Sequence, residues 1–164
     1  MASRKFQESL DEIEKILCEE TVGYLGLSKD GIPYVVPLNY AYAGGKIIFH
    51  CALSGRKLDY LQANPLACFT VGRMAGQVQR HAEGSACDVD NDSAICYGTA
   101  RILEDLEERK KALDLFNRHY NADADDISLE SASKCYAVEI AITHMTGRQQ
   151  RGDERFYWKY SFES

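Results

Sequence analysis

The chain has 164 residues and a hydrophobic content of 45%, which is enough for one domain, residues 1–164, with a substantial buried core. A net charge of −6 at pH 7 argues against general nucleic-acid binding, because that function needs a basic field. No run of about 18 apolar residues occurs, so we expect no membrane span. Charged and apolar residues alternate over residues 1–17, a pattern unlike a signal peptide, and we therefore expect a cytoplasmic protein.

The first third of the chain predicts one helix and three strands. Apolar residues recur at helical spacing over residues 4–20, which indicates an amphipathic helix. Strands are predicted at 21–27, 32–42 and 46–51, with turns at 28–31 and 44–45. Pro33 and Pro37 limit the hydrogen bonding of the second strand, which favours an edge strand or a bulge.

The rest of the chain predicts strands and helices around one long loop. We expect helices at 54–63 and 104–120, and strands at 66–71, 93–103 and 134–145. Residues 72–92 hold few large apolar side chains and predict the loop. An acidic connector follows at 121–133, and the charged, aromatic tail at 147–164 is expected to dock on the domain. Strands in hairpin order favour a mostly β fold, an antiparallel barrel with flanking helices.

The six cysteines include no CxxC pair, so their spacing does not favour a metal site or a disulfide framework. Cys51, Cys68, Cys96 and Cys135 lie within apolar, strand-like runs, which is typical of buried free thiols. Cys87 lies in the polar loop and is the one candidate for an exposed thiol. We therefore predict free cysteines and no metal.

The strongest candidate for a binding site lies where the strand at 46–51 meets the helix at 54–63. Ser54 offers a hydroxyl group, Arg56 a guanidinium that can grip two oxygens at once, and Lys57 an ammonium. The first N–H groups of a helix have no partner within it, and the helix dipole is positive there. The junction therefore predicts an anion site, best suited to phosphate. The alternative is that Arg56 and Lys57 are solvated helix residues.

Three segments of the sequence resemble the pyridoxamine 5'-phosphate oxidase-like family of split-barrel flavin-binding proteins. They are GIPYVVPLNY (31–40), GGKIIFHCALSGRKLDYLQANPLACFTV (44–71) and SAICYGTARILEDLEERKKALDLF (93–116). His50, Gly55 and Lys57 keep the HxAxxGxK spacing of the nitroimidazole-resistance-type branch. The resemblance extends over residues 10–148 and implies an antiparallel split β-barrel with flanking helices.

The resemblance also implies FMN bound at the interface of a homodimer, with one site for each subunit. The residues expected along the isoalloxazine ring are Pro37, Leu38, Asn39 and Tyr40. Those expected to hold the ribityl chain and the phosphate are His50, Ser54, Arg56 and Lys57. Those expected on the other side of the ring are Ser93 and Gly98, and Arg148, with Thr146 and Gly147, is expected to reach the partner's site.

Three of these residues have plain alternative roles. Asn39 carries a donor and an acceptor that suit the pyrimidine edge of the ring, but it also suits a bulge or turn in a strand with prolines. Tyr40 is either a ring contact or a packing residue, as tyrosines in strands usually are. His50 is a ligand contact, a structural histidine, or a ligand to metal or haem.

By resemblance, we expect an FMN-dependent oxidoreductase that passes electrons or hydride to a small electron-poor substrate, such as a nitro compound. The flavin would carry the redox chemistry, and the protein would supply binding, orientation and electrostatics. No side chain stands out as a catalytic acid or base. The alternatives are a non-catalytic flavin or haem binder and a binder of a pyridoxal-type phosphate. The expected partners are a small-molecule substrate and a second copy of the chain, with neither nucleic acid nor membrane.

Overall fold

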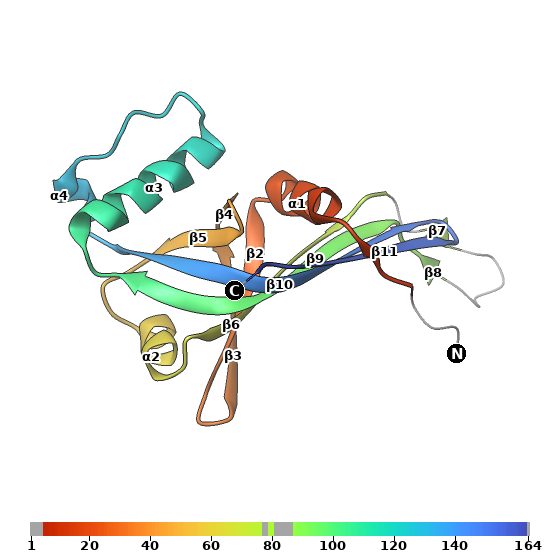
Figure 1. The fold of residues 1–164 in the computed structure, drawn as a ribbon, viewed down its shortest axis with the longest axis horizontal. Coiled ribbons are helices and arrows are strands. Elements are labelled where there is room, and N and C mark those ends of the chain that lie inside the picture. The colour runs from red at the N-terminus through yellow and green to blue at the C-terminus, as the bar shows by residue number, and fades with distance from the viewer. Residues whose placement is uncertain (1–4, 77–78, 81–86, 164) are drawn as a thin grey trace.

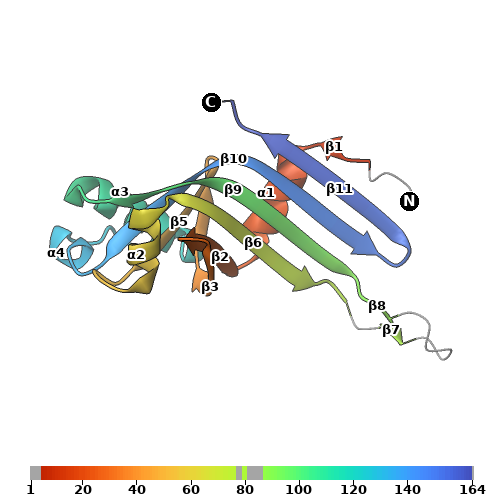
Figure 2. The same ribbon diagram turned by 90° about the horizontal axis from the view of Figure 1, so that it is seen from below.

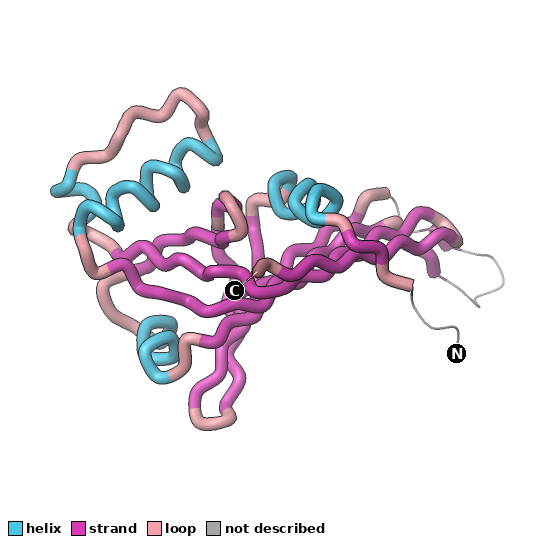
Figure 3. Tube along the Cα trace, in the orientation of Figure 1, coloured by secondary structure: helices cyan, strands magenta, loops and turns pink. Residues whose placement is uncertain are grey.

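The computed structural model describes residues 5–76, 79–80 and 87–163, and strands make up most of it (Figures 1 and 3). The strands are β1 (Gln7–Glu8), β2 (Val22–Lys29), β3 (Ile32–Asn39), β4 (Ala41–Ala43), β5 (Lys46–Cys51), β6 (Leu66–Met74), β7 (Gln79–Arg80), β8 (Cys87–Asp88), β9 (Asn91–Leu103), β10 (Tyr136–Arg151) and β11 (Glu154–Ser161). The helices are α1 (Leu10–Glu19), α2 (Arg56–Ala63), α3 (Leu106–Tyr120) and α4 (Leu129–Ala132).

Nine of these strands form one open sheet in the order β1-β11-β10-β9-β6-β2-β3, with β5 added to β10 and β4 added to β5. Figure 2 shows β6, β9, β10 and β11 side by side. Every pairing is antiparallel except that of β1 with β11. Strand β10 pairs with β9 along most of its length, with β5 on its first half and with β11 on its second half. The predicted mostly β, antiparallel split-barrel architecture is therefore confirmed.

Two apolar clusters hold the helices against the sheet. Helix α1 buries Ile13, Ile16 and Leu17 in the main core, together with Phe49 and Phe69 from the strands. Helix α3 packs a second cluster against β4, β5, β9 and β10, made of Ala41, Ile48, Leu103, Ala112, Leu113, Phe116, Ala132 and Ala137. In Figure 1, α1 and α3 lie above the sheet and α2 lies below it. No helix within the described ranges is long and apolar enough to cross a membrane.

The first predicted helix begins later in the structure than its apolar spacing indicates. Helix α1 begins at Leu10, where the Ser9 hydroxyl accepts a hydrogen bond from the backbone N–H of Glu12. The residues just before it, Gln7 and Glu8, pair with β11 instead. A capping serine and a non-local strand pairing therefore outweigh the helical pattern over residues 5–9.

The predicted strand at 32–42 is interrupted at Tyr40, which separates β3 from β4. The Tyr120 hydroxyl accepts a hydrogen bond from the Tyr40 backbone N–H at 3.1 Å and donates one to the Tyr40 carbonyl at 2.7 Å. A side chain of α3 thus satisfies the backbone groups at the break. Among the described strands, β3 pairs only with β2 and forms an edge of the sheet, as Pro33 and Pro37 predict.

The prediction of a loop over residues 72–92 is wrong at both ends, where the structure has strands. Strands β6 and β9 continue to pair as far as Met74 and Asn91, and β7 pairs with β8 beyond them. Backbone hydrogen bonds carry this extension with few large apolar side chains, so composition alone misses it. Residues 77–78 and 81–86, with His81 among them, and the side chain of Cys87 lie outside the described part of the chain. The aromatic tail docks as predicted, in the form of strand β11.

Candidate functional site

The predicted anion site is an open pocket of about 240 Å³ at the start of α2. Strand β5 ends at Cys51, and residues 52–55 lead directly into the helix at Arg56. The pocket is lined by Tyr34, Cys51, Ala52, Ser54, Gly55, Arg56, Lys57 and Leu58. The structure therefore brings Ser54, Arg56 and Lys57 together, as the sequence predicts.

Gly55 shapes the floor of this α2 pocket. It is the N-cap of α2, with φ 128° and ψ 171°, a backbone conformation that favours glycine. Its carbonyl accepts hydrogen bonds from the N–H groups of Leu58 and Asp59 at 2.9 and 3.2 Å. No described side chain caps the helix, and apart from Gly55 and its two chain neighbours no described residue has an atom within 4 Å of the place that a Cβ would take. The N-terminus of α2 is therefore open to an anion.

Two cations stand beside this N-terminus. The Arg56 guanidinium lies 5.9 Å from the centre of the Tyr34 ring, and the Lys57 Nζ lies 5.3 Å from the centre of the Phe49 ring. Burial lowers the pKa of Lys57, since it favours the neutral amine. Within the described ranges, neither Arg56 nor Lys57 forms an ion pair with a carboxylate. Their charges therefore remain available to an anion, and this donor set suits phosphate.

His50 does not line the α2 pocket. Its ring is exposed and packs edge-on against Phe116 of α3, with 5.1 Å between the ring centres. The next residue, Cys51, lines the pocket, and neighbouring side chains on a strand point to opposite faces. In a single chain, His50 thus points toward α3, while Ser54 and Lys57 point to the pocket. No group of three or more candidate metal-binding side chains occurs among the residues that the structure describes.

The four residues predicted to contact the flavin ring lie on β3 and directly after it. Their side chains point to two different faces of the sheet. Pro37 and Asn39 are exposed, and the Asn39 side-chain amide donates a hydrogen bond to the Thr21 carbonyl at 3.0 Å. Leu38 is half-buried and packs on the core. Tyr40 is 0% exposed, and its hydroxyl donates to the Leu17 carbonyl at 2.6 Å. The Tyr40 side chain is therefore a core residue, and burial raises its pKa.

Ser93 and Arg148 meet at a second pocket, of about 130 Å³, on strands β9, β10 and β11. They lie directly opposite each other in the register of β9 and β10. We call this cavity the hairpin pocket; its lining residues are Phe6, Ser93, Ile95, Thr146, Gly147, Arg148 and Tyr157. The structure thus brings Arg148, Thr146 and Gly147 together with Ser93.

Gly98 lies outside the hairpin pocket. The packing of the sheet explains why this position is a glycine. A Cβ at this position would lie 2.2 Å from the Ala141 carbonyl oxygen. The contact occurs beside an irregularity in β10, where the register with β9 shifts between Ile142 and His144. A glycine is therefore needed here to let two strands approach.

The strand register places Pro37, Asn39, Ser93 and Arg148 on the same face of the sheet. Directly opposed residues share a face, and the pairs Tyr24–Pro37, Tyr24–Thr70, Thr70–Ile95 and Ser93–Arg148 link the strands. Exposed apolar side chains on the same face belong to Val22, Tyr24, Val35, Leu66, Met74 and Tyr97. We call this surface the open face; it includes a groove of about 470 Å³ between β3, β2, β6 and β9.

The sequence patterns do not single out Tyr34 or Phe6 as pocket residues. Tyr34 belongs to β3, and its ring packs 5.1 Å from that of Tyr60 on α2, a contact that strand alternation does not reveal. Phe6 lies before β1, and its ring centre is 5.6 Å from that of Tyr157. The only local signal was the aromatic character of these side chains, because their partners lie far along the chain.

Comparisons with known proteins agree with this architecture. A sequence model of the pyridoxamine 5'-phosphate oxidase family matches residues 9–149. A crystal structure from Bacteroides thetaiotaomicron, of a candidate 5-nitroimidazole antibiotic resistance protein, is 30% identical with a TM-score of 0.76, and the match covers 86% of this chain and 84% of that one. A FAD-binding protein from Mesorhizobium loti is 27% identical with a TM-score of 0.65, over 87% of this chain and 96% of that one.

More distant relatives share the fold or a part of the sequence. The FAD and haem binding protein of Mycobacterium smegmatis has a TM-score of 0.76 over 94% of this chain and 83% of its own, at 16% identity. An uncharacterised protein of Rhizobium meliloti is 26% identical over 72 residues, which is 43% of this chain. That match spans 46% of the relative, or about half its length. From the match over residues 9–149 and the Bacteroides relative, the chain belongs to the pyridoxamine 5'-phosphate oxidase family, as the sequence predicts.

Proposed function

We propose that the protein binds FMN and uses it to pass electrons or hydride to a small electron-poor substrate. The observation that carries this proposal is the α2 pocket, where Arg56 and Lys57, which form no ion pair with any described carboxylate, lie at a helix N-terminus that no described side chain caps. A phosphate monoester is a dianion near neutral pH and needs this kind of neutralisation. Arg56 would grip phosphate oxygens, Lys57 would add a point charge, and Ser54 and the first N–H groups of α2 would add hydrogen bonds.

The nature of the cofactor is supported by the relatives. The Mesorhizobium loti protein is described as FAD-binding, which supports a flavin, and the resemblance to the oxidase-like family favours FMN. A bound flavin supplies the hydride and electron chemistry, and the chain's own residues bind and orient it. Asn39 is exposed and offers its side-chain oxygen to the polar edge of a ring, and the nearby Pro37 offers an apolar wall.

We further propose that the working form is a homodimer in which the open face is covered by a second copy. Val35 of β3 and Leu66 of β6 on that face are 63% and 65% exposed, and the neighbouring strands β2 and β9 add the exposed Tyr24 and Tyr97. Monomeric proteins rarely leave so many neighbouring apolar side chains in water. A second copy would bring the hairpin pocket of one subunit, with Ser93 and Arg148, toward the cofactor of the other.

Titration of the flavin-free protein with FMN tests the cofactor, with flavin fluorescence and absorbance as the readout. We expect a Kd in the micromolar range or below. The double variant Arg56→Ala/Lys57→Ala is expected to bind about a hundredfold more weakly, because two charge-assisted contacts are lost. The control Lys15→Ala/Lys111→Ala removes the same charge from exposed helix positions and is expected to leave the Kd unchanged. Equal losses of FMN affinity in the two double variants would contradict the proposal that the α2 pocket binds the phosphate.

Redox activity is tested separately on the FMN-loaded protein. NADH or NADPH oxidation in the presence of a nitroaromatic acceptor is expected to proceed over many turnovers. Binding of FMN without any turnover, with either donor, would favour the non-catalytic flavin-binding alternative and would leave the α2 pocket intact as its explanation.

A further inference from the structure

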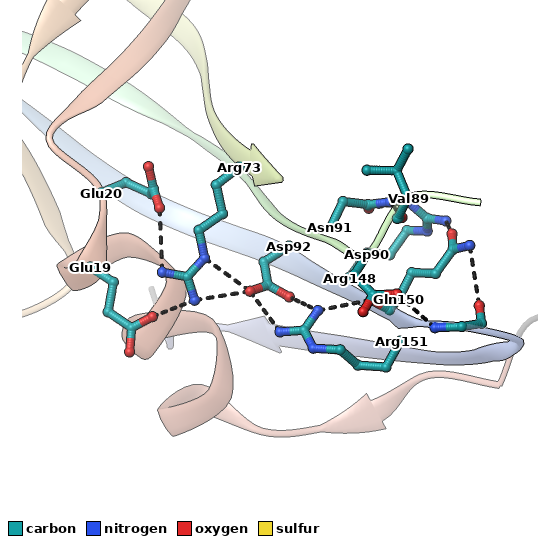
Figure 4. Close-up of polar contacts among 11 residues, drawn as sticks. Glu19, Glu20, Arg73, Val89, Asp90, Asn91, Asp92, Arg148, Gln150 and Arg151 are labelled. Atoms are coloured by element: carbon teal, nitrogen blue, oxygen red, sulfur yellow. Dashed lines mark hydrogen bonds and ion pairs between the residues drawn. The ribbon is translucent and has the colours of Figure 1, made fainter. Parts of the chain in front are cut away.

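Among the described residues, the side chains that hold the Arg148 guanidinium in place are neutral. Its guanidinium donates hydrogen bonds to the side-chain oxygens of Asn91, at 2.6 Å, and Gln150, both of which are neutral (Figure 4). Nearby, Arg151 pairs with the carboxylate of Asp92 at 2.8 Å. Across residues 5–76 and 89–163, no carboxylate forms an ion pair with Arg148. Two neutral amides thus hold Arg148 in place without offsetting its charge.

Arg148 has donors left for a ligand. A guanidinium carries five N–H groups in a planar fork, and two of them are used by Asn91 and Gln150. The remaining three form no hydrogen bond with the described residues and can donate to an anion, and planar anions such as carboxylates match the fork. Ser93 and Thr146, which line the same pocket, add hydroxyl groups.

The rest of the hairpin pocket suits an aromatic ring. The rings of Phe6 and Tyr157 lie 5.6 Å apart at an interplanar angle of 52°, and Ile95 adds an aliphatic wall. Ring-to-ring contacts at such distances are favourable in tilted as well as offset geometries. The cavity of about 130 Å³ compares with an engineered cavity of about 150 Å³ that holds benzene. It therefore has room for one ring and opens outward for a substituent.

We infer that the hairpin pocket binds a single-ring aromatic carboxylate, with the carboxylate on Arg148 and the ring against Phe6 and Tyr157. We assign this ligand as the substrate class of the enzyme. That assignment of a role rests on the proposed function, because a substrate must lie beside the bound flavin. The binding itself does not depend on the flavin, since every residue named belongs to the folded chain.

Benzoate is the probe, and the flavin-free protein is titrated with it by NMR of the ¹⁵N-labelled chain. We expect saturable shifts at residues of β9, β10 and β11. Arg148→Gln is expected to weaken binding at least about tenfold, because a charge-assisted pair is lost. The control Arg155→Gln removes the same charge from an exposed position on β11 and is expected to change the Kd by less than about twofold. Benzamide, which lacks the charge, is expected to bind more weakly than benzoate.

A second variant keeps the test valid if Arg148→Gln fails to fold. Ile95→Phe fills the ring space of the hairpin pocket and leaves Arg148 intact, and it is expected to abolish the benzoate shifts. Unchanged benzoate affinity in a folded Arg148→Gln or Ile95→Phe variant overturns the inference. So does a wild-type protein that shows no saturable shifts.

The FMN-loaded protein tests the role of the ligand. We expect benzoate to perturb the visible absorbance of the bound flavin, with the Kd measured in the flavin-free titration. Displacement of benzoate by FMN would overturn the assignment as a substrate pocket, because it would make Ser93 and Arg148 flavin contacts instead. A protein that binds benzoate but no FMN would refute the proposed function alone and leave the aromatic carboxylate site standing.

Discussion

The ammonium of Lys57 lies 5.3 Å from the centre of the Phe49 ring, so the charge that is proposed to meet a phosphate is partly removed from water. Burial lowers the pKa of Lys57, and the lysine therefore loses its charge at a lower pH than a solvated lysine does. A cation that lies next to an aromatic face, and that forms no ion pair with a described carboxylate, can bind a phosphate without first breaking such a pair.

This environment predicts a pH dependence of FMN affinity. Lys57 is charged below its pKa, so affinity is expected to fall about tenfold or more as the pH rises through that lowered pKa. Lys57→Arg is expected to keep its affinity over the same range, because arginine stays charged. Fluorescence titrations at intervals from neutral to alkaline pH measure both. Lys111→Arg is the control, and identical pH profiles for wild type and Lys57→Arg would contradict the role of Lys57.

Gly55→Ala tests the backbone conformation at the start of α2. At φ 128° an alanine is strained, and we expect a loss of about 1–3 kcal/mol in the free energy of unfolding together with weaker FMN binding. Urea denaturation and FMN titration measure the two effects. Gly72→Ala is the matched control, because its added Cβ would meet atoms only at 3.7 Å or more. If Gly55→Ala matches Gly72→Ala in both measurements, the backbone conformation of Gly55 contributes to neither stability nor FMN binding.

Local signals were enough to predict the junction of β5 and α2. The turn at Gly44–Gly45 fixed the start of β5, and Asn64-Pro65 fixed the end of α2, so Ser54, Arg56 and Lys57 had to lie between them. Local signals do not give the orientation of the His50 and Tyr40 side chains. Their orientation is set by α3, through Phe116 and Tyr120, which follow 66 and 80 residues later in the chain. Short-range sequence patterns do not reveal such contacts.

Gly98→Ala separates a packing role from a cofactor role. An added Cβ would lie 2.2 Å from the Ala141 carbonyl, and a backbone atom cannot move aside cheaply. We expect a loss of about 3 kcal/mol or a failure to fold, as in strongly overpacked sites. Urea denaturation measures it, with Gly72→Ala again as the control. A stable Gly98→Ala protein with weakened FMN binding would instead support the ligand role that the resemblance implies.

Asp92 of β9 is part of a network of ion pairs that links β6, β9, β10 and the end of α1. Its buried carboxylate accepts hydrogen bonds from Arg73 and Arg151, each at 3.0 Å, and Arg73 also pairs with Glu19 and Glu20 of the α1 end (Figure 4). Burial by itself raises the pKa of Asp92, but the hydrogen bonds from Arg151 and Arg73 outweigh it and hold the pKa below its usual range. The contribution of Asp92 to stability is therefore present above the unfolded-state pKa and lost as the pH falls through the lower folded-state pKa.

Asp92→Asn is accordingly expected to lower the free energy of unfolding by about 2–3 kcal/mol at pH 7, because two arginines lose their anionic partner. The difference from wild type is expected to shrink at acidic pH, below about 4, where the unfolded carboxyl is protonated. Urea unfolding at both pH values measures this, with the exposed Asp153→Asn as the charge-matched control. A difference that does not change with pH would show that the carboxylate charge is not what stabilises the network.

Leu66→Lys tests the proposed dimer. Leu66 is 65% exposed on the open face and lines its groove, so a lysine there costs little in a monomer but buries a charge in the interface. We expect light scattering after size exclusion to show a dimer for wild type and a monomer for the variant, with FMN affinity reduced in parallel. Leu115→Lys, at an exposed position of α3, is the control and is expected to remain dimeric. A Leu66→Lys dimer with unchanged FMN affinity would rule out the open face as the surface that completes the cofactor site.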